Sequence, residues 1–87
     1  MPTVNIPSPL RSYTQGAASV VAEGVKVADV LEDLERRFPG IRFRMIDEQD
    51  RIRQHIRIFV NTEGVNDLSS AVAKHDVVHL ICALSGG

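Results

Sequence analysis

The chain has 87 residues, of which 10 are basic and 11 acidic, giving a formal net charge of −1. A chain of this length forms one small domain, which leaves little room for a deep catalytic cleft. The basic excess that favours nucleic-acid binding is missing, and no apolar run approaches the roughly 20 residues of a membrane span. We therefore expect function at the surface or at a chain end, with neither nucleic acid nor membrane as a partner.

Two short strands are predicted at the start of the chain. Polar and apolar residues alternate over Thr3–Ile6, and a second extended segment covers Ser19–Ala22. The turn-rich connection between them ends at Gly16. This arrangement favours an antiparallel hairpin.

An amphipathic helix follows. Its apolar residues recur at the spacing i, i+3, i+4, i+7 and i+11, namely Val27, Val30, Leu31, Leu34 and Phe38. Pro39 and Gly40 predict its end, whereas the residues before Val27 supply no side-chain cap. The helix is the most strongly patterned element of the sequence.

The second half of the chain is predicted to be mainly extended. Residues 41–53 are charged and irregular, and we expect a short extended piece and a solvated loop there. Alternation then predicts a strand over residues 55–61, with Phe59 on its exposed face. The remaining elements are a turn at residues 62–64, a short strand at Val65, a helical turn over residues 68–72, and a last strand over Val77–Cys82. Strands before and after one main helix are typical of the α+β class.

The chain ends with Leu84, Ser85, Gly86 and Gly87. Four extended residues reach about 13 Å, and glycines can enter a channel that is too narrow for other residues. A terminal Gly-Gly pair is also common in frayed chain ends. On this pair alone, a functional tail and an idle tail remain equally open.

Several motifs together resemble a known superfamily. They are Ile6-Pro7, Leu10-Arg11, Tyr13-Thr14, the Val-x-x-Val-Leu of the helix, residues 38–41 (FPGI), residues 55–61 (HIRIFVN), Asp76-x-Val78 and the final Gly-Gly. The chain resembles the ubiquitin-like sulfur carriers, which include the molybdopterin-synthase small subunit and the thiamine sulfur carrier, and is most similar to the longer, cysteine-forming carriers. The resemblance implies a β-grasp fold, with a mixed sheet packed on one main helix over residues 1–83 and a C-terminal tail over residues 84–87.

The resemblance also implies a function for the tail. A partner adenylyltransferase similar to ubiquitin-activating enzymes would use ATP to activate Gly87, with Gly86 and Ser85 giving it access. A persulfide or sulfide donor would convert Gly87 to a thiocarboxylate, and a sulfur-accepting synthase would take the sulfur toward cysteine or molybdopterin. The chain has no phosphate-binding GxxxxGK loop. It would therefore be a carrier that binds no cofactor itself and acts with partner enzymes.

Three alternatives stay open. The activated Gly87 could be joined to lysines of other proteins, as in a ubiquitin-like modifier. The chain could be the small subunit of a molybdopterin synthase. It could also be a plain interaction module with an idle tail.

Other candidate sites are weaker. Cys82 is the only cysteine and lies in an apolar strand, so it is expected to behave as a small hydrophobic residue. One cysteine forms no internal disulfide, and residues 1–10 lack the features of a secretion signal, so we expect a cytoplasmic protein. His75 and His79 are too few for a metal site.

Two surface features could contact partners. Phe59, His79 and Ile81 share the outward parity of neighbouring strands, and we expect them to form a docking surface. Five arginines, at positions 42, 44, 51, 53 and 57, could orient an acidic partner. Nearby acidic residues favour the simpler interpretation of a solvated and partly neutralised loop.

Overall fold

The structure is a computed structural model that describes residues 1–83; the predicted tail, residues 84–87, lies outside the described residues. Its elements in chain order are β1 (Thr3–Asn5), a 3-10 turn (Ser8–Leu10), β2 (Ser19–Val21), α1 (Val27–Arg37), α2 (Ile41–Met45), β3 (Ile56–Val60), β4 (Glu63–Val65) and β5 (Val77–Cys82). No helix within residues 1–83 has the length and apolar character needed to cross a bilayer.

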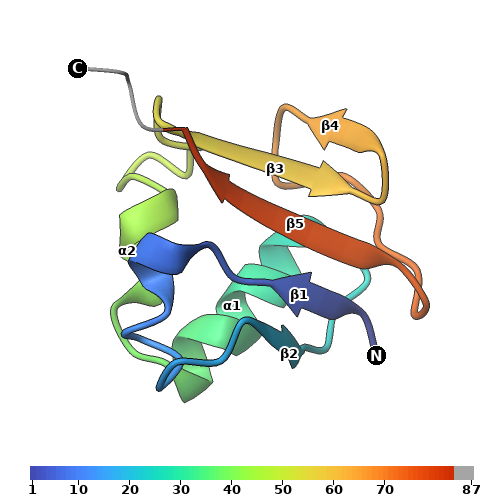
Figure 1. The fold of residues 1–87 in the computed structure, drawn as a ribbon. Helices are drawn as coiled ribbons and strands as arrows, with labels where there is room; N and C mark the ends of the chain where they lie inside the picture. The colour runs from blue at the N-terminus through green and yellow to red at the C-terminus, as the bar shows by residue number, and fades with distance from the viewer. Residues whose placement is uncertain (84–87) are drawn as a thin grey trace.

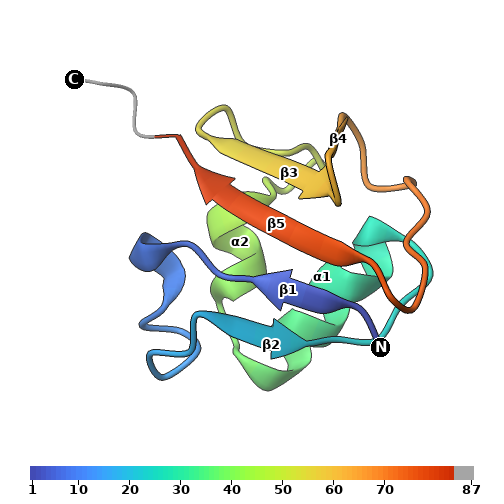
Figure 2. The same ribbon diagram turned by 45° about the vertical axis from the view of Figure 1, so that its right-hand side comes forward.

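The five strands form one mixed sheet in the order β2-β1-β5-β3-β4 (Figures 1 and 2). The hairpin predicted from the first two strands is confirmed, because β1 pairs antiparallel with β2. The last strand, β5, runs between β1 and β3, parallel to the first and antiparallel to the second. This central position fixes the end of the chain within the sheet.

One face of the sheet forms the core with α1. Strand β3 alternates strictly, with Ile56, Ile58 and Val60 buried, and β5 buries Val78 and Leu80. These side chains face the apolar side of α1, where Val27, Val30, Leu31 and Leu34 are fully buried. The predicted α+β class and the mixed sheet on one main helix are confirmed.

The start of α1 is capped by a distant loop. The N–H groups of Val27 and Ala28 donate to the carbonyls of Ser70 (2.9 Å) and Leu68 (2.9 Å). The first helical N–H groups lack partners inside a helix, so carbonyls from the loop take the place of the missing cap residue. The helical turn predicted over residues 68–72 is wrong: the segment forms a bend and turn ending in a single bridge between Ala71 and Lys26. Its carbonyls serve α1 instead of a helix of their own.

The prediction for residues 41–53 is wrong in its first part. Residues 41–45 form the short helix α2, which buries Ile41 and Met45 on one side, and Ile46 is also buried. Gly40 makes the corner between the helices with φ 97°, a backbone angle that favours glycine. The Glu35 carboxylate accepts hydrogen bonds from the N–H groups of Gly40 and Arg42, both at 2.9 Å. The expected loop begins only after Ile46, whose bridge to Ile52 closes it.

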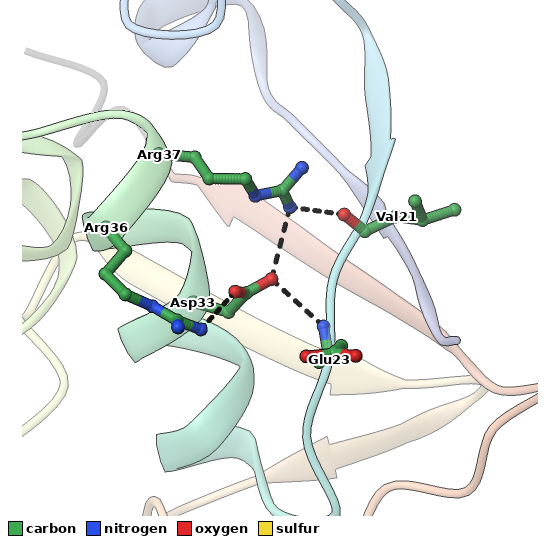
Figure 3. A network of polar contacts seen from close by, with 5 residues as sticks. All are labelled: Val21, Glu23, Asp33, Arg36 and Arg37. Atoms are coloured by element: carbon green, nitrogen blue, oxygen red, sulfur yellow. Dashed lines mark hydrogen bonds and ion pairs between the residues drawn. The ribbon is translucent and has the colours of Figure 1, made fainter.

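Polar side chains of α1 cover the outer edge of β2 (Figure 3). Asp33 is only 8% exposed and accepts a hydrogen bond from the N–H of Glu23 at 3.0 Å. It also pairs with Arg36 at 2.5 Å and Arg37 at 3.3 Å, and Arg37 donates to the carbonyl of Val21. An open strand edge can pair with another chain. The helix thus satisfies backbone groups on this edge.

Candidate functional site

The described chain leaves the sheet at the end of β5. Cys82 pairs with Ile56 in β3, and the N–H of Ala83 donates to the carbonyl of His55 at 2.7 Å. Backbone contacts therefore hold the chain up to its last described residue. The predicted functional residues Gly87, Gly86 and Ser85 lie outside the described residues and stay predictions. What the structure adds is the position from which they follow: one end of a central strand, beside the start of β3 (Figure 1).

A hollow of about 260 Å³ lies next to this position. It is lined by Phe43, Arg44, Arg53 and His55, and we call it the exit hollow. The Arg53 guanidinium lies 4.5 Å from the centroid of the Phe43 ring, and its Nε donates to the Phe43 carbonyl at 2.7 Å. An arginine stacked on an aromatic face is held in place while its outer N–H groups remain available.

The five arginines of residues 42–57 do not form one continuous cluster. Arg42 pairs with Asp50 at 3.1 Å, and Arg51 pairs with Asp47 at 3.4 Å. The backbone N–H groups of Arg51 and Gln49 hold the pKa of the Asp47 carboxyl below its usual value. The interpretation of a partly neutralised loop is therefore correct for these two arginines.

Three arginines have other partners or none. Arg53 stacks on Phe43, and Arg57 donates to the carbonyls of Gln54 (2.8 Å) and Ile56 (3.0 Å). Arg44 is exposed. Within residues 1–83, none of these three arginines has a carboxylate within ion-pair distance. Arg44 and Arg53 both line the exit hollow. The sequence does not predict this hollow, because it predicts a short extended piece where Phe43 and Arg44 lie in α2.

The structure brings the predicted docking residues together on the outer face of the sheet. Phe59 lies directly opposite His79 in the β3–β5 pairing, and Ile81 follows two residues along β5. Ile81 is 43% exposed, whereas Phe59 and His79 are half-buried. The Phe59 ring lies over Gly64, and His79 Nδ1 is 3.0 Å from the side-chain amide of Asn5. The three side chains thus share a face, and their role in docking stays a prediction.

Cys82 behaves as expected of a small hydrophobic residue. It lies on the inner side of β5, is half-buried, and packs against the core. Burial raises the pKa of its thiol, and the positive charge of Arg44 offsets this only in part. A raised pKa keeps the thiol protonated and unreactive near neutral pH. Nothing in this setting assigns sulfur chemistry to Cys82.

The two candidate metal-binding histidines lie apart in the fold. His75 is exposed in the turn before β5, whereas His79 lies within the strand on the outer face. Within residues 1–83, no three histidine, cysteine, aspartate or glutamate side chains are grouped so that they could hold a metal ion.

Comparison with known proteins places the chain in a family. Residues 4–87 match the model of the ThiS family. The sulfur carrier protein CysO of Mycobacterium tuberculosis is 37% identical over 90 residues, covering 98% of this chain and 97% of that protein. A chain in the crystal structure of the Amycolatopsis orientalis BexX/CysO complex has 34% identity and a TM-score of 0.93, with 100% of both chains covered.

A more distant structural relative has the same fold. SAMP1 from Haloferax volcanii is 25% identical, with a TM-score of 0.76 and 98% and 97% of the two chains covered. These TM-scores show that the chain shares its fold with both relatives. The fold, the match over almost the whole chain and the identity to CysO lead to one conclusion: the chain belongs to the ThiS family of ubiquitin-like sulfur carriers.

Proposed function

We propose that this protein carries sulfur as a thiocarboxylate on Gly87, the last residue of the sequence. Proteins of this family are carriers and not enzymes, so the chemistry falls to partners. A partner adenylyltransferase binds ATP, since no described element of this chain has a phosphate-binding glycine loop. A second partner, the acceptor synthase, takes the sulfur from the tail.

The proposed reaction has two steps on the carrier. A carboxylate oxygen of Gly87 attacks the α-phosphate of ATP, so that an acyl adenylate forms and pyrophosphate leaves. A sulfide sulfur then attacks the acyl carbon, the bond to AMP breaks, and Gly87 ends as a thiocarboxylate. A persulfide donor would give an acyl disulfide, which a thiol must reduce before the thiocarboxylate is free.

The observation that carries the proposal is the match of the family model through Gly87. The geometry at the other end of the tail supports it. Ala83 is hydrogen-bonded to His55, and the four residues beyond it can reach about 13 Å. A fixed base and a short extension suit a group that must enter the active site of another protein.

The identity to proteins named sulfur carrier protein CysO favours the longer, cysteine-forming branch that the sequence resembles. We propose a cysteine-forming synthase as the first acceptor to test. The large subunit of a molybdopterin synthase is the second.

The likeness to SAMP1, the small archaeal modifier protein 1, supports one alternative. In that case the activated Gly87 would form an amide with lysines of other proteins. Both functions begin with the same adenylation. They differ in the product that accumulates when a sulfur donor is present.

Intact mass spectrometry distinguishes these possibilities. The chain is incubated with ATP, a sulfur donor and an activating enzyme from the source organism. A gain equal to the oxygen-to-sulfur mass difference, located in the C-terminal peptide, is expected for a carrier. Higher-mass conjugates that contain Gly87 bonded to lysine would instead support a modifier.

A matched variant tests whether the tail is the reactive group. One alanine added after Gly87 moves the carboxylate but leaves the β-grasp fold unchanged, so it should abolish the mass gain. Cys82→Ala should retain the gain, because the half-buried thiol has no assigned role. Sulfur incorporation by the extended chain would refute the proposal.

A further inference from the structure

The exit hollow combines a fixed cation with an exposed aromatic ring. Phe43 is 58% exposed although it is a large apolar side chain. The Arg53 guanidinium lies over its ring at 4.5 Å, and the backbone carbonyl of Phe43 accepts from Arg53 Nε at 2.7 Å. Two contacts therefore hold the arginine, which lowers the entropy that a partner must remove on binding.

The charge at this hollow is not compensated within residues 1–83. Arg42 and Arg51 are paired with Asp50 and Asp47, but Arg44 and Arg53 have no carboxylate within ion-pair distance. Arg44 is exposed beside the hollow. Two guanidinium groups next to an exposed aromatic ring form a positive surface on a chain whose formal net charge is −1.

The position of the hollow connects it with the tail. His55 lines the hollow, and its carbonyl accepts the hydrogen bond from Ala83. A protein that acts on Gly87 must approach within the reach of four residues from Ala83, about 13 Å. The surface of that partner, around the channel that admits the tail, must then cover the exit hollow.

We propose that the exit hollow docks an acidic loop of the activating enzyme that adenylates Gly87. Carboxylates of that loop pair with Arg44 and Arg53, and an apolar side chain of the loop packs on Phe43. Charge complementarity of this kind steers association and fixes orientation, and charges at the rim act mainly on the rate of encounter. The inference rests on the function proposed above.

The test uses charge reversal at Arg44, for which the structure shows no hydrogen bond that the change would break. The activating enzyme is fractionated from the source organism by following ATP–pyrophosphate exchange that depends on this chain. The same exchange assay then measures KM and kcat for each variant. Arg44→Glu is expected to raise KM about tenfold at low salt with kcat within about twofold, because a like charge opposes encounter. The effect should shrink near 1 M salt, where the Debye length falls to about 3 Å.

Lys74→Glu is the matched control. It makes the same change in charge. Lys74 is exposed in the turn before β5, whereas Ala83 follows the other end of that strand. Six residues of β5 separate the two ends by about 17 Å. Lys74→Glu should keep the KM of the unaltered chain, and Arg44→Lys should restore most of the affinity.

The outcomes separate the two proposals. Absence of chain-dependent exchange with the unaltered protein would refute the proposed function itself. Normal exchange with equal KM values for Arg44→Glu and Lys74→Glu would overturn the docking inference alone. Arg53→Gln gives a second measurement: it removes the stacked cation, and a KM unchanged from that of the unaltered chain would also count against the inference.

Discussion

Replacement of Asp33 by alanine should destabilise the fold through the edge of the sheet. The Asp33 carboxylate is 8% exposed and joins α1 to the segment after β2 by accepting from the N–H of Glu23 at 3.0 Å. It also anchors Arg37, whose side chain donates to the carbonyl of Val21 (Figure 3). One substitution therefore removes the acceptor of the Glu23 N–H and the anchor of the arginine that donates to the Val21 carbonyl.

The magnitude follows from the surroundings of each contact. A hydrogen bond to a charged group contributes about 1.5–3 kcal/mol, and the exposure of Glu23 to water favours the lower half of this range because its N–H can be hydrated again. The side chains of Arg36 and Arg37 are 73% and 41% exposed, so the ion pairs add at most about 1 kcal/mol together. We expect a total loss of about 2–3 kcal/mol, or roughly 10–20 °C in Tm for a domain of this size.

Urea unfolding followed by circular dichroism measures this loss. Glu32→Ala is the control, since Glu32 is an exposed neighbour on the same helix. Asp33→Asn keeps an acceptor for the Glu23 N–H and loses only the charge, so it should cost about half as much. A loss for Asp33→Ala within about 0.5 kcal/mol of Glu32→Ala would refute the reasoning.

Three further changes test other parts of the fold. Gly24→Ala should cost more than about 2 kcal/mol in urea unfolding, because Gly24 has φ +151° and its new Cβ would lie 2.7 Å from the backbone of α1. A Cβ added at Gly16 would have no atom within 4 Å, so Gly16→Ala should cost only about 1 kcal/mol, from the positive φ of that residue. Met45→Ala should cost about 2–5 kcal/mol because the side chain is fully buried in α2, and an equal cost for exposed Phe43→Ala would contradict this account. Hydrogen bonds from the N–H of Ala73 and the side chain of Asn61 hold the pKa of Asp76 below the ordinary value of an aspartate. The stability contributed by the ionised carboxylate is therefore present above that ordinary pKa and is lost as the pH falls through the lowered one. Asp76→Asn should weaken this acid dependence, and an unchanged pH profile would contradict it.

Much of the fold could be predicted from local pattern. The 3.6-residue period from Val27 and the alternation around Ile58 depend only on which side chains face a core, so α1 and β3 were predicted with nearly correct bounds. Helix α2 was missed because five residues contain little more than one turn, and only Ile41 and Met45 show its period. Its stability comes from packing and from the Glu35 carboxylate, neither of which a short window can reveal.

The candidate site was only partly predictable for the same reason. The Gly-Gly ending and the shared parity of Phe59, His79 and Ile81 can be read along the chain. The exit hollow cannot, because it combines side chains from α2 and the loop before β3 at the end of β5. The resemblance to sulfur carriers implied the tail chemistry but not this surface.

The sequence by itself determined the main helix, the strands and which of their faces are apolar, since these properties arise from neighbouring residues. Tertiary structure decided the strand order, with β5 placed parallel to β1 in the centre of the sheet. It also supplied the cap of α1, where Ser70 and Leu68 accept hydrogen bonds from residues some 40 positions earlier in the chain. Contacts of this kind depend on the closure of long loops, whose partners no local pattern specifies.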